Sequence, residues 1–512
     1  MVYNYAESNI IRHIPRYYIT TKFDQSINNE YLCAMNTNKT IIGREREKGI
    51  LKECLNSGQP EFIAVFGRRR IGKTFLIKQF FKNKFDFYMT GVVGSSMPEM
   101  LEYFNAQLQY YSGKEWPLAT TWMKAFRQLQ EYLSSLKKRR IVVFIDELPW
   151  LDTPRSNFFR ALDLFWNGWG DSQSNLKFIV CGSATTWMTS KLLGDKDGLH
   201  NRVTRQIYLA PFNLYETEKM LQSNGIRWSR HQITECYMVV GGTPYYLAKM
   251  DCKQSVAQNI DRLFFHHTGE LRNEYEFLFR SLFKDSAIYR RVVEILASKS
   301  VGMTREDILA TLDLSDGGAL TEVIKNLITC DFIREYNAYG NKRKGKLYQL
   351  TDLFTLFYLK QVKDAKTQVG DFWLTRIDSP SHRAWSGYAF EQVCLHHIPQ
   401  IKMALGISGV ASQISSWRGM MDGKIIGQID LIIDRRDETI NLCEMKYSLR
   451  EFEITPSYLN KMIDRMEDFR ESTKTKKALH LTFVTVNGVK HNAQWGMIQN
   501  EVTADQLFTS VP

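Results

Sequence analysis

The chain contains 512 residues with a mass of 59.7 kDa, which is too long for one hydrophobic core and predicts about three or four domains. Hydrophobic residues make up 44% of the chain and charged residues 24%, and this composition excludes an intrinsically disordered protein. The net charge is +12, and the surplus lies in the first 380 residues because basic and acidic residues balance from Ser381 to Pro512. Such a surplus favours an anionic partner, for example a nucleotide or a nucleic acid.

The cysteines and the apolar runs indicate the cellular compartment of the protein. The eight cysteines are scattered singly, with no C-x-x-C motif and no histidine pair at metal-ligand spacing, so we expect reduced thiols and no zinc site. Met1–Ile19 lacks the apolar core of a signal peptide, and apolar runs such as Ile141–Ile145 are far shorter than the ~20 residues of a membrane helix. These features predict a cytoplasmic protein without a membrane partner.

The first half of the chain has the pattern of an α/β domain. Residues 1–40 show no sustained hydrophobic period and are expected to form an N-terminal extension. Over residues 41–212, short apolar runs alternate with amphipathic segments, which predicts a doubly wound parallel sheet of the P-loop NTPase type. The expected strands are Phe62–Phe66, Phe85–Val93, Ile141–Ile145, Phe178–Cys181 and Gln206–Ala210, and the expected helices are Phe75–Phe81, Met97–Tyr111 and Trp122–Leu136.

Three further domains are expected downstream. A helical lid domain is expected at residues 213–280, a winged-helix domain at 281–360, and a C-terminal α/β domain of the restriction-endonuclease type at 381–512. The winged helix is predicted from the helices Ile288–Ala297, Arg305–Leu312 and Ala319–Thr329, followed by two strands around a basic turn. The C-terminal elements are a helix at Tyr388–His397, strands at Ile425–Ile433 and Ile440–Lys446, a helix at Pro456–Ser472 and a strand at Leu479–Val486.

A phosphate-binding loop follows the first expected strand. The sequence G-x-x-x-x-G-K-T lies between an apolar strand and a helix, which is the context that this motif requires. Its glycines let backbone N–H groups turn inward, and the helix N-terminus adds positive potential for phosphate. Lys73 is expected to contact the β- and γ-phosphates of ATP, and the Thr74 hydroxyl to ligate Mg²⁺. The expected nucleotide-binding residues of this segment are Gly67, Arg68, Arg69, Arg70, Ile71, Gly72, Lys73, Thr74 and Phe75.

A pair of carboxylates ends the strand at Ile141–Ile145. Asp146 suits the magnesium shell, and Glu147 suits the polarisation of an attacking water. The strand-forming segment Phe85–Val93 lies between this pair and the loop in sequence, and we expect it to be an extra central strand. The sequence therefore predicts a site for magnesium-dependent ATP hydrolysis.

Two more polar residues complete the expected hydrolytic site. Ser183 follows the strand Phe178–Cys181 and is the candidate γ-phosphate sensor. Arg202 lies just before the last strand and could supply charge to the transition state, either in cis or from a neighbouring subunit of a homo-oligomer. A capping serine and a surface arginine are the open alternatives for these two residues.

These motifs, in this order, resemble the archaeal-type ATPase family, which belongs to the signal-transducing P-loop ATPases related to AAA proteins. The resemblance runs from about Ile41 to Leu247, and by it Arg44 lies near the adenine or ribose of the nucleotide. The family usually has Gly-Arg where this chain has Asn201-Arg202. The resemblance is carried by the segments GRERE (43–47), FGRRRIGKT (66–74), IDELPWL (145–151), CGS (181–183) and GGTPYYL (241–247).

The expected winged helix leaves two roles open. Its basic turn suits contact with the phosphates of DNA or RNA, but the third helix, Ala319–Thr329, offers few polar groups for reading bases. A winged helix in this ATPase branch often packs on the ATPase domain as a lever. Nucleic-acid contact and the structural role both remain hypotheses. The basic residues of the turn are Lys342, Arg343, Lys344 and Lys346.

The last domain carries a second set of carboxylates. Asp430 ends one expected strand, and Glu444 and Lys446 form an E-x-K motif on the next, where strand alternation puts both on one face. Two carboxylates can hold Mg²⁺ at a scissile phosphate while a lysine orients water. The segment Trp385–Val486 resembles the PD-(D/E)xK nuclease superfamily, in which Glu391 matches the helix acid. An inactive remnant is the alternative, and the zero net charge of this domain favours it.

Together these observations predict an ATPase that hydrolyses ATP with Mg²⁺ and couples its nucleotide state to a winged-helix and nuclease-like effector acting on DNA or RNA. A second hypothesis is a nucleotide-gated switch or scaffold with slow turnover and no nuclease activity. In a third hypothesis the nuclease is the principal effector, and ATP serves only to permit its activity.

Overall fold

The computed structural model describes residues 40–183, 185–194, 199, 201–283, 285–313, 317–340, 346–365, 372–377, 379–421 and 424–511. The expected N-terminal extension up to residue 39 lies outside the described residues, as do Lys342, Arg343 and Lys344 of the expected basic turn. Among the described residues, no helix is both long and apolar enough to cross a membrane.

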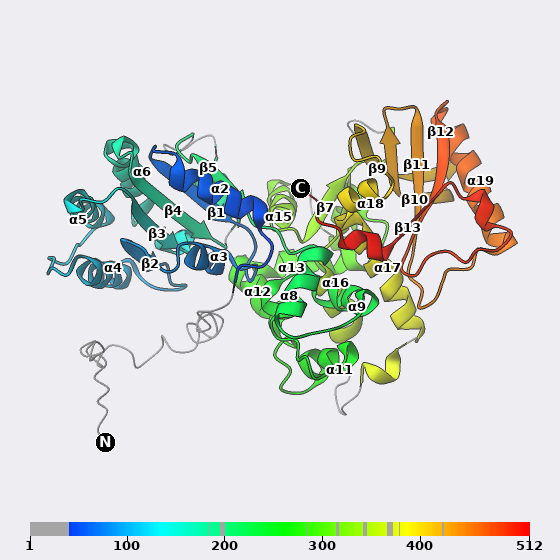
Figure 1. Cartoon of the computed structure of the whole chain (residues 1–512), viewed down its shortest axis with the longest axis horizontal. Helices are drawn as coiled ribbons and strands as arrows, with labels where there is room; N and C mark the ends of the chain where they lie inside the picture. The colour runs from blue at the N-terminus through cyan, green and yellow to red at the C-terminus, as the bar shows by residue number, and fades with distance from the viewer. Residues whose placement is uncertain are drawn as a thin grey trace, which may run out of the picture.

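The first domain is built around a parallel sheet of five strands, in the order β2-β3-β4-β1-β5. Alternate residues of each strand enter different cores: Phe62 and Ala64 of β1 pack against α4, α5 and α6, while Ile63 and Val65 pack against α2 and α3. Helices therefore cover both faces of the sheet, as the alternating sequence pattern predicted (Figure 1). The strands are β1 (Glu61–Phe66), β2 (Phe87–Thr90), β3 (Ile141–Asp146), β4 (Leu176–Gly182) and β5 (Arg205–Tyr208). The helices are α2 (Glu45–Asn56), α3 (Lys73–Phe80), α4 (Met97–Ser112), α5 (Trp122–Ser135), α6 (Phe158–Gly168) and α7 (Thr185–Trp187).

The strand expected to be central lies at the edge of this sheet. β2 pairs only with β3 within the described residues, and β4 is the strand inserted between β1 and β3. β2 has four residues, only half of them buried, which suits an edge position better than a central one. The prediction of a central strand at Phe85–Val93 was therefore wrong, and the central strand is the one that ends next to Ser183.

A helical region follows β5. Three of its helices begin with a capping box, in which a side-chain oxygen and the residue three positions later satisfy each other's backbone N–H groups. The turn at Gly241–Gly242 is close-packed: Phe212 N donates to Gly242 O at 2.7 Å, and a Cβ on Gly242 would lie 1.7 Å from Phe212 O. The helices are α8 (Leu214–Ser223), α9 (Arg230–Val240), α10 (Pro244–Leu247), α11 (Val256–Ile260) and α12 (Glu274–Leu282).

Three helices and a small antiparallel sheet come next, close to the residues where the sequence predicts three helices and two strands. The sheet has the order β6-β8-β7, and its first strand was not expected. A short helix, α16, follows β8 directly. The elements are α13 (Ser286–Ser298), β6 (Met303–Thr304), α14 (Arg305–Leu312), α15 (Gly318–Thr329), β7 (Ile333–Tyr336), β8 (Leu347–Leu350) and α16 (Leu353–Phe357).

The C-terminal segment forms a second five-stranded sheet, in the order β13-β12-β11-β10-β9. β9, β10 and β11 pair antiparallel, whereas β11, β12 and β13 pair parallel, so the sheet is mixed. The sequence indicated β10, β11 and β12 but not the two edge strands. The elements are α17 (Pro380–His396), α18 (Ile398–Ala404), β9 (Ser412–Met421), β10 (Lys424–Arg435), β11 (Thr439–Lys446), α19 (Pro456–Thr473), β12 (Ala478–Thr485) and β13 (Asn500–Thr503).

One apolar core joins the later segments. Buried residues of the helical region, the three-stranded sheet, α16, α17 and β11 form a single cluster, whereas the faces of the first sheet have clusters of their own. The segment after β7 also reaches the C-terminal sheet, because Tyr339 N donates to Ser416 O at 2.6 Å and the Tyr339 ring lies 4.9 Å from Phe469. The part of the chain after Pro211 is therefore a continuous packed unit.

Candidate functional site

The loop between β1 and α3 has the backbone that its sequence predicts. Gly67 has φ 142° and Gly72 has φ 87°, both in the region that favours glycine. A Cβ on Gly67 would lie 2.4 Å from Leu209 O, so this position has no room for a side chain. Gly72 caps α3, which begins at Lys73, and the loop therefore leads directly into a helix N-terminus. Ile71 packs in the core below the loop, while Phe75 lies in the first turn of α3 and is partly exposed.

Lys73 and Thr74 connect this loop to the end of β3. The Lys73 ammonium is buried and donates to Gly67 O and Arg68 O, each at 3.0 Å. The Thr74 hydroxyl donates to Asp146 Oδ2 at 2.7 Å, although the two residues are 72 positions apart. The structure thus brings together the two residues that the sequence assigned to magnesium.

Glu147 is held by the residue expected to be a phosphate sensor. Its Oε2 accepts hydrogen bonds from Ser183 N at 3.1 Å and from Ser183 Oγ at 2.8 Å. Glu147 has φ 47°, an uncommon left-handed conformation for a residue of this type. Because β3 and β4 are adjacent parallel strands, the residues that follow them meet at one edge of the sheet.

Arg202 lies beside the amino ends of the strands of this sheet, whereas the phosphate-binding loop lies at their carboxyl ends. It is exposed in the turn before β5, and β5 pairs in parallel with β1 so that Arg205 is opposite Ile63. The loop at Gly67 follows the other end of β1, on the order of 20 Å away at the rise of a β-strand. Within one chain Arg202 is therefore far from the loop, and its role in hydrolysis stays a prediction, with a neighbouring subunit and an ordinary surface arginine as the two alternatives.

Arg44 lies between the first domain and the helical region. Its guanidinium is 4.5 Å from the centre of the Phe212 ring, and its backbone N donates to Glu216 Oε1 at 3.1 Å. Burial lowers the pKa of Arg44, and Glu216 only partly opposes this effect. The buried Nη2 has no hydrogen-bond partner within the described residues, so Arg44 keeps one donor for a ligand.

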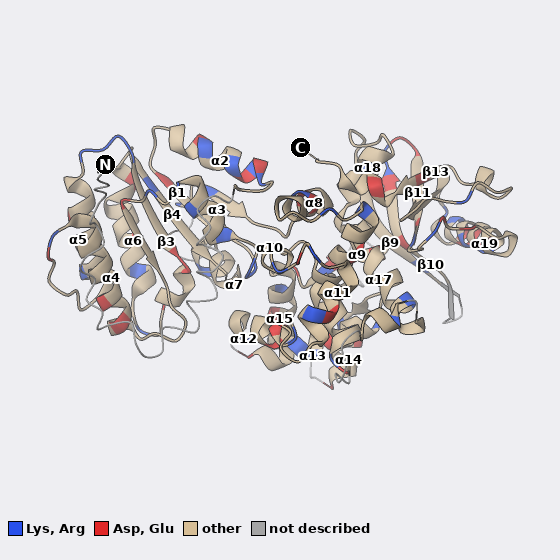
Figure 2. Cartoon of the chain, turned by 60° about the horizontal axis from the view of Figure 1, so that its bottom comes forward, with Lys and Arg blue, Asp and Glu red and all other residues tan. Residues whose placement is uncertain are grey.

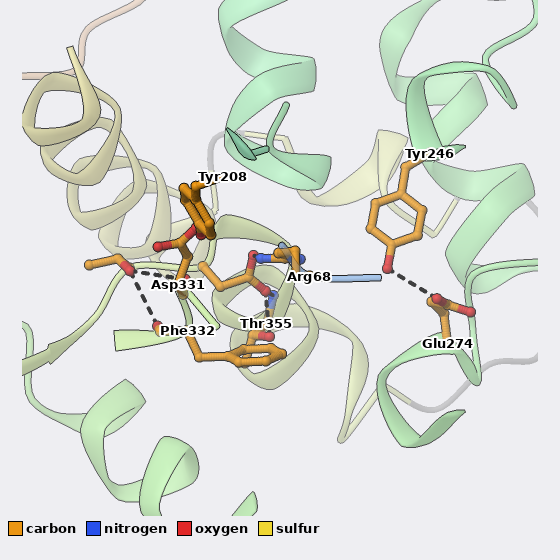
Figure 3. A network of polar contacts seen from close by, with 9 residues as sticks. Arg68, Tyr208, Tyr246, Glu274, Asp331, Phe332 and Thr355 are labelled. Carbon is orange, nitrogen blue, oxygen red and sulfur yellow. Dashed lines mark hydrogen bonds and ion pairs between the residues drawn. The ribbon is translucent and has the colours of Figure 1, made fainter. Parts of the chain in front are cut away.

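Sequence reasoning missed the partners of Arg68, which Figure 3 shows, and of Arg70. Arg68 is buried and its Nη1 lies 2.5 Å from Asp352 Oδ1, in the segment after β8. Arg70 Nη2 donates to Glu274 Oε2 at 2.9 Å, and its guanidinium lies 3.9 Å from the centre of the Tyr245 ring. Arg69 is partly exposed. No sequence motif marks Asp352 or Glu274, which lie 284 and 204 positions from their partners.

The expected carboxylates of the C-terminal sheet lie on adjacent strands. The antiparallel register pairs Leu431 with Cys443, which places Asp430 opposite Glu444. Lys446 lies 2.9 Å from Glu444 Oε1, as the E-x-K alternation predicts. Burial, with a contribution from Asp430, raises the pKa of Glu391 to about 8. Within the described residues, however, no three His, Cys, Asp or Glu side chains gather closely enough to form a metal site.

Glu444 has further partners that the sequence did not indicate. Arg465 Nη1 on α19 donates to its Oε2 at 2.9 Å, and the Tyr458 hydroxyl donates to Oε1 at 2.6 Å. Burial by itself would raise the pKa of Glu444, but Lys446 and Arg465 outweigh it and hold the pKa below its usual value. Figure 2 shows charges of both signs along α19, and basic and acidic residues balance over residues 381–512 as a whole.

The small sheet also faces this cluster. Arg334 on β7 lies 5.2 Å from the centre of the Tyr336 ring, and the Tyr388 hydroxyl of α17 donates to Leu350 O at 3.2 Å. Burial lowers the pKa of Arg334, and the charges that oppose this effect include Asp430 and Glu391. The hairpin β7–β8 is therefore packed beside the carboxylates of the C-terminal sheet.

Comparison with known proteins identifies the first domain. Residues 42–250 match a family described as an ATPase domain predominantly from Archaea. An uncharacterized protein of Methanocaldococcus jannaschii is 25% identical over 420 residues, which cover 80% of this chain and 87% of the relative. An uncharacterized ATP-binding protein of the same organism is 42% identical over 44 residues, 9% of this chain and 75% of the relative.

Two solved structures are similar to parts of the chain. The Walker-type ATPase of Pyrococcus abyssi is 19% identical and has a TM-score of 0.45, with coverage of 62% of this chain and 96% of its own. The ORC2 protein of Aeropyrum pernix, in ADPNP and ADP complexes, is 14% identical and has a TM-score of 0.40, with coverage of 63% and 95%. The family match, together with the observed loop and sheet, confirms an archaeal-type ATPase domain at residues 42–250.

Proposed function

We propose that the chain binds ATP together with Mg²⁺ and hydrolyses it at the edge of the first sheet. The observation that carries this proposal is the contact of Thr74 with Asp146, with Glu147 immediately beside them. A phosphate-binding loop, a metal-ligating hydroxyl and two carboxylates are the parts that P-loop hydrolysis requires. Helix α3 points its N-terminus at the same place and favours an anion there.

The residues suit magnesium by the chemistry of their donors. Thr74 Oγ1 and the Asp146 carboxylate are hard oxygen ligands, which Mg²⁺ prefers. When bound, the ion would neutralise charge on the phosphates. Lys73 would exchange its contacts with Gly67 O and Arg68 O for phosphate oxygens. Glu147 would orient the attacking water, and Ser183 would orient Glu147.

The first experiment is magnesium-dependent ATP hydrolysis by the full chain, with Lys73→Ala and Glu147→Gln as variants. We expect Lys73→Ala to abolish binding and Glu147→Gln to keep binding while it abolishes turnover. Lys78→Ala, a lysine on the same helix α3, is the matched control and should leave both unchanged. Wild-type protein that does not bind ATP would refute the proposal.

A second candidate function is a nucleotide-gated switch with very slow turnover. The observation that favours it is the pair of hydrogen bonds from Ser183, which engage the Glu147 oxygen that would otherwise approach water. A switch would bind ATP as tightly as an ATPase does. It differs in that Glu147→Gln would leave its slow turnover almost unchanged.

We further propose that the later segments form the effector. The three helices and the sheet β6-β8-β7 support a winged helix, and the Asp430, Glu444 and Lys446 cluster supports a domain of the PD-(D/E)xK type. Glu391 would be the helix acid of that site, with Asp430 and Glu444 as the metal ligands. DNA or RNA would be the partner, and exposed Arg202 would act in a homo-oligomer.

Cleavage of DNA and RNA in the presence of Mg²⁺, with and without ATP, tests the effector. Asp430→Ala should abolish cleavage and spare ATP hydrolysis, whereas Asp437→Ala, at an exposed carboxylate on the following turn, should spare both. If the wild-type chain cleaves neither nucleic acid under any nucleotide condition, the C-terminal domain acts as a scaffold.

A further inference from the structure

A buried ion pair links the phosphate-binding loop to a segment outside the ATPase domain. Arg68 is 2% exposed and Asp352 7% exposed, and their Nη1 and Oδ1 atoms are 2.5 Å apart. Arg68 also stacks on Phe332, with its guanidinium 5.3 Å from the ring centre. Its Nε and Nη2 atoms have no hydrogen-bond partner within the described residues, so Asp352 is the group that compensates this buried charge.

Asp352 is itself held rigidly. It is the N-cap of α16, and its Oδ2 accepts from Thr355 N at 2.9 Å and from Thr355 Oγ1 at 2.6 Å. The backbone N of Asp352 donates to Phe332 O at 3.2 Å. One carboxylate oxygen is thus fixed by the helix, and the other is directed at Arg68. The network in Figure 3 shows this arrangement around Phe332 and Thr355.

The anchored arginine belongs to the backbone that holds the phosphate-binding lysine. The Lys73 ammonium donates to Arg68 O at 3.0 Å, so one residue carries both the ion pair and a carbonyl that orients Lys73. A fixed Arg68 side chain limits the movement of this carbonyl. Loop geometry matters because the backbone N–H groups and Lys73 must meet the phosphates together.

We propose that Asp352 is a positioning residue of the ATPase site and that it acts through Arg68 on the loop that holds Lys73. The inference rests on the proposed function and adds a residue from outside the ATPase domain to it. The segment around α16 packs on the loop that binds ATP. By thermodynamic linkage, ATP binding and this packing must then influence each other. The nucleotide state would reach the later domains through this contact.

Another contact between the same surfaces provides a control. The Tyr208 hydroxyl of β5 donates to Asp331, which directly precedes Phe332, and the Tyr208 ring lies 5.5 Å from Phe66. Tyr208 is the last residue of β5 and is not part of the loop. Tyr208→Phe therefore weakens the packing of the same segment without removing the anchor of the loop.

The test measures ATP binding by calorimetry, ATP turnover and thermal melting of the full chain. Asp352→Asn keeps a side-chain oxygen for Thr355 and removes the charge that pairs with Arg68. We expect ATP binding to weaken by about tenfold or more, equivalent to about 1.4 kcal/mol. Tyr208→Phe should bind ATP within about twofold of the wild type.

A double variant covers the case in which Asp352→Asn fails to fold. Arg68→Met with Asp352→Asn leaves no uncompensated buried charge, and neutral replacement of a buried pair is often tolerated. A positioning role predicts a melting temperature near that of the wild type together with weak ATP binding. A merely structural role predicts that the double variant recovers both.

The outcomes separate this inference from the function on which it rests. In one outcome the wild type binds ATP, Lys73→Ala abolishes binding, and the folded double variant binds ATP normally. This outcome would overturn the role of Asp352 and leave the proposed ATPase function intact. Equal losses in Tyr208→Phe and Asp352→Asn would also overturn it, because packing alone would then explain the effect. Absence of ATP binding by the wild type would overturn both proposals.

Discussion

Single residues decide the orientation of the groups in the candidate site. Glu147 accepts two hydrogen bonds from Ser183, one from the backbone and one from the hydroxyl, so its carboxylate has a defined direction. The buried Lys73 is oriented in a similar way by two carbonyl oxygens. Both arrangements come from residues that follow neighbouring strands of the first sheet, β1, β3 and β4.

Ser183→Ala tests the orientation of Glu147. The variant loses one hydrogen bond to a charged group, so we expect kcat for ATP to fall by about tenfold while binding stays within about twofold. Steady-state hydrolysis and calorimetric binding of the full chain measure these quantities. Ser190→Ala, at an exposed serine shortly after Ser183, is the control. A kcat equal to that of the wild type would remove Ser183 from the catalytic machinery.

Glu235 predicts a pH dependence of stability. Burial on α9 raises its pKa from 4.5 to about 7, near the place where the His231 ring lies 6.1 Å from Tyr447. The Glu235 carboxyl keeps its proton to a higher pH in the folded state than in the unfolded state. Its contribution to the free energy of unfolding is therefore full below pH 4.5 and is lost as the pH rises through about 7. Glu235→Gln should therefore show a smaller fall in melting temperature between these pH values. An identical fall in both proteins would contradict the prediction.

At the scale of elements, the close approach of two turns sets the position of the helical region. Phe212 follows β5, and its backbone N donates a hydrogen bond to Gly242 O in the turn before α10. Tyr245 N donates to Arg70 O at 3.4 Å, so the same turn also reaches the phosphate-binding loop. The glycine is required because no Cβ fits between these two stretches of backbone.

Gly242→Ala should damage this junction. The new Cβ would lie 1.7 Å from Phe212 O, and because backbone must move, we expect a loss of about 3 kcal/mol in the free energy of unfolding. Gly49→Ala, in the middle of α2 with nothing within 4 Å of the added Cβ, should instead stabilise the protein by about 0.5–1 kcal/mol. Urea unfolding of both variants measures these changes. A Gly242→Ala protein as stable as the wild type would show that the junction can relax.

At the scale of the whole molecule, the region after Pro211 is one packed unit that contacts the first sheet's phosphate-binding loop. The hairpin β7–β8 packs against α17 and the C-terminal sheet, and Ala338, two residues after its first strand, forms a bridge with Ser416. The expected use of this hairpin as a free nucleic-acid wing therefore competes with an internal contact.

Tyr339→Ala should loosen the hairpin from the C-terminal sheet. The change removes the ring that lies 4.9 Å from Phe469, and we expect faster backbone hydrogen exchange in β9 and α19, with ATP binding within about twofold of the wild type. Hydrogen exchange followed by mass spectrometry resolves these elements. Tyr110→Ala, at a tyrosine of α4 that is 76% exposed, should change neither. Unchanged exchange in β9 would mean that the bridge alone holds the hairpin.

The sequence by itself determined the geometry of the candidate ATPase site, because its parts obey local rules. Gly67 and Gly72 mark a loop that needs positive φ, and the apolar run before Asp146 marks a buried strand. Parallel strands then bring Thr74, Asp146 and Glu147 to one edge whatever the details of packing. The same rules predicted the E-x-K alternation at Glu444.

Only the tertiary structure decided which residues from distant segments complete these sites. β2 took the edge and β4 the centre because strand order depends on packing against helices, which no local period encodes. The pairing of Arg68 with Asp352 crosses 284 positions, and that of Arg465 with Glu444 joins a helix to a strand. Such pairs have no characteristic spacing in the sequence, because the fold brings the two residues together. The candidate site was therefore readable from local motifs, whereas the contacts between its domains arise from long-range burial.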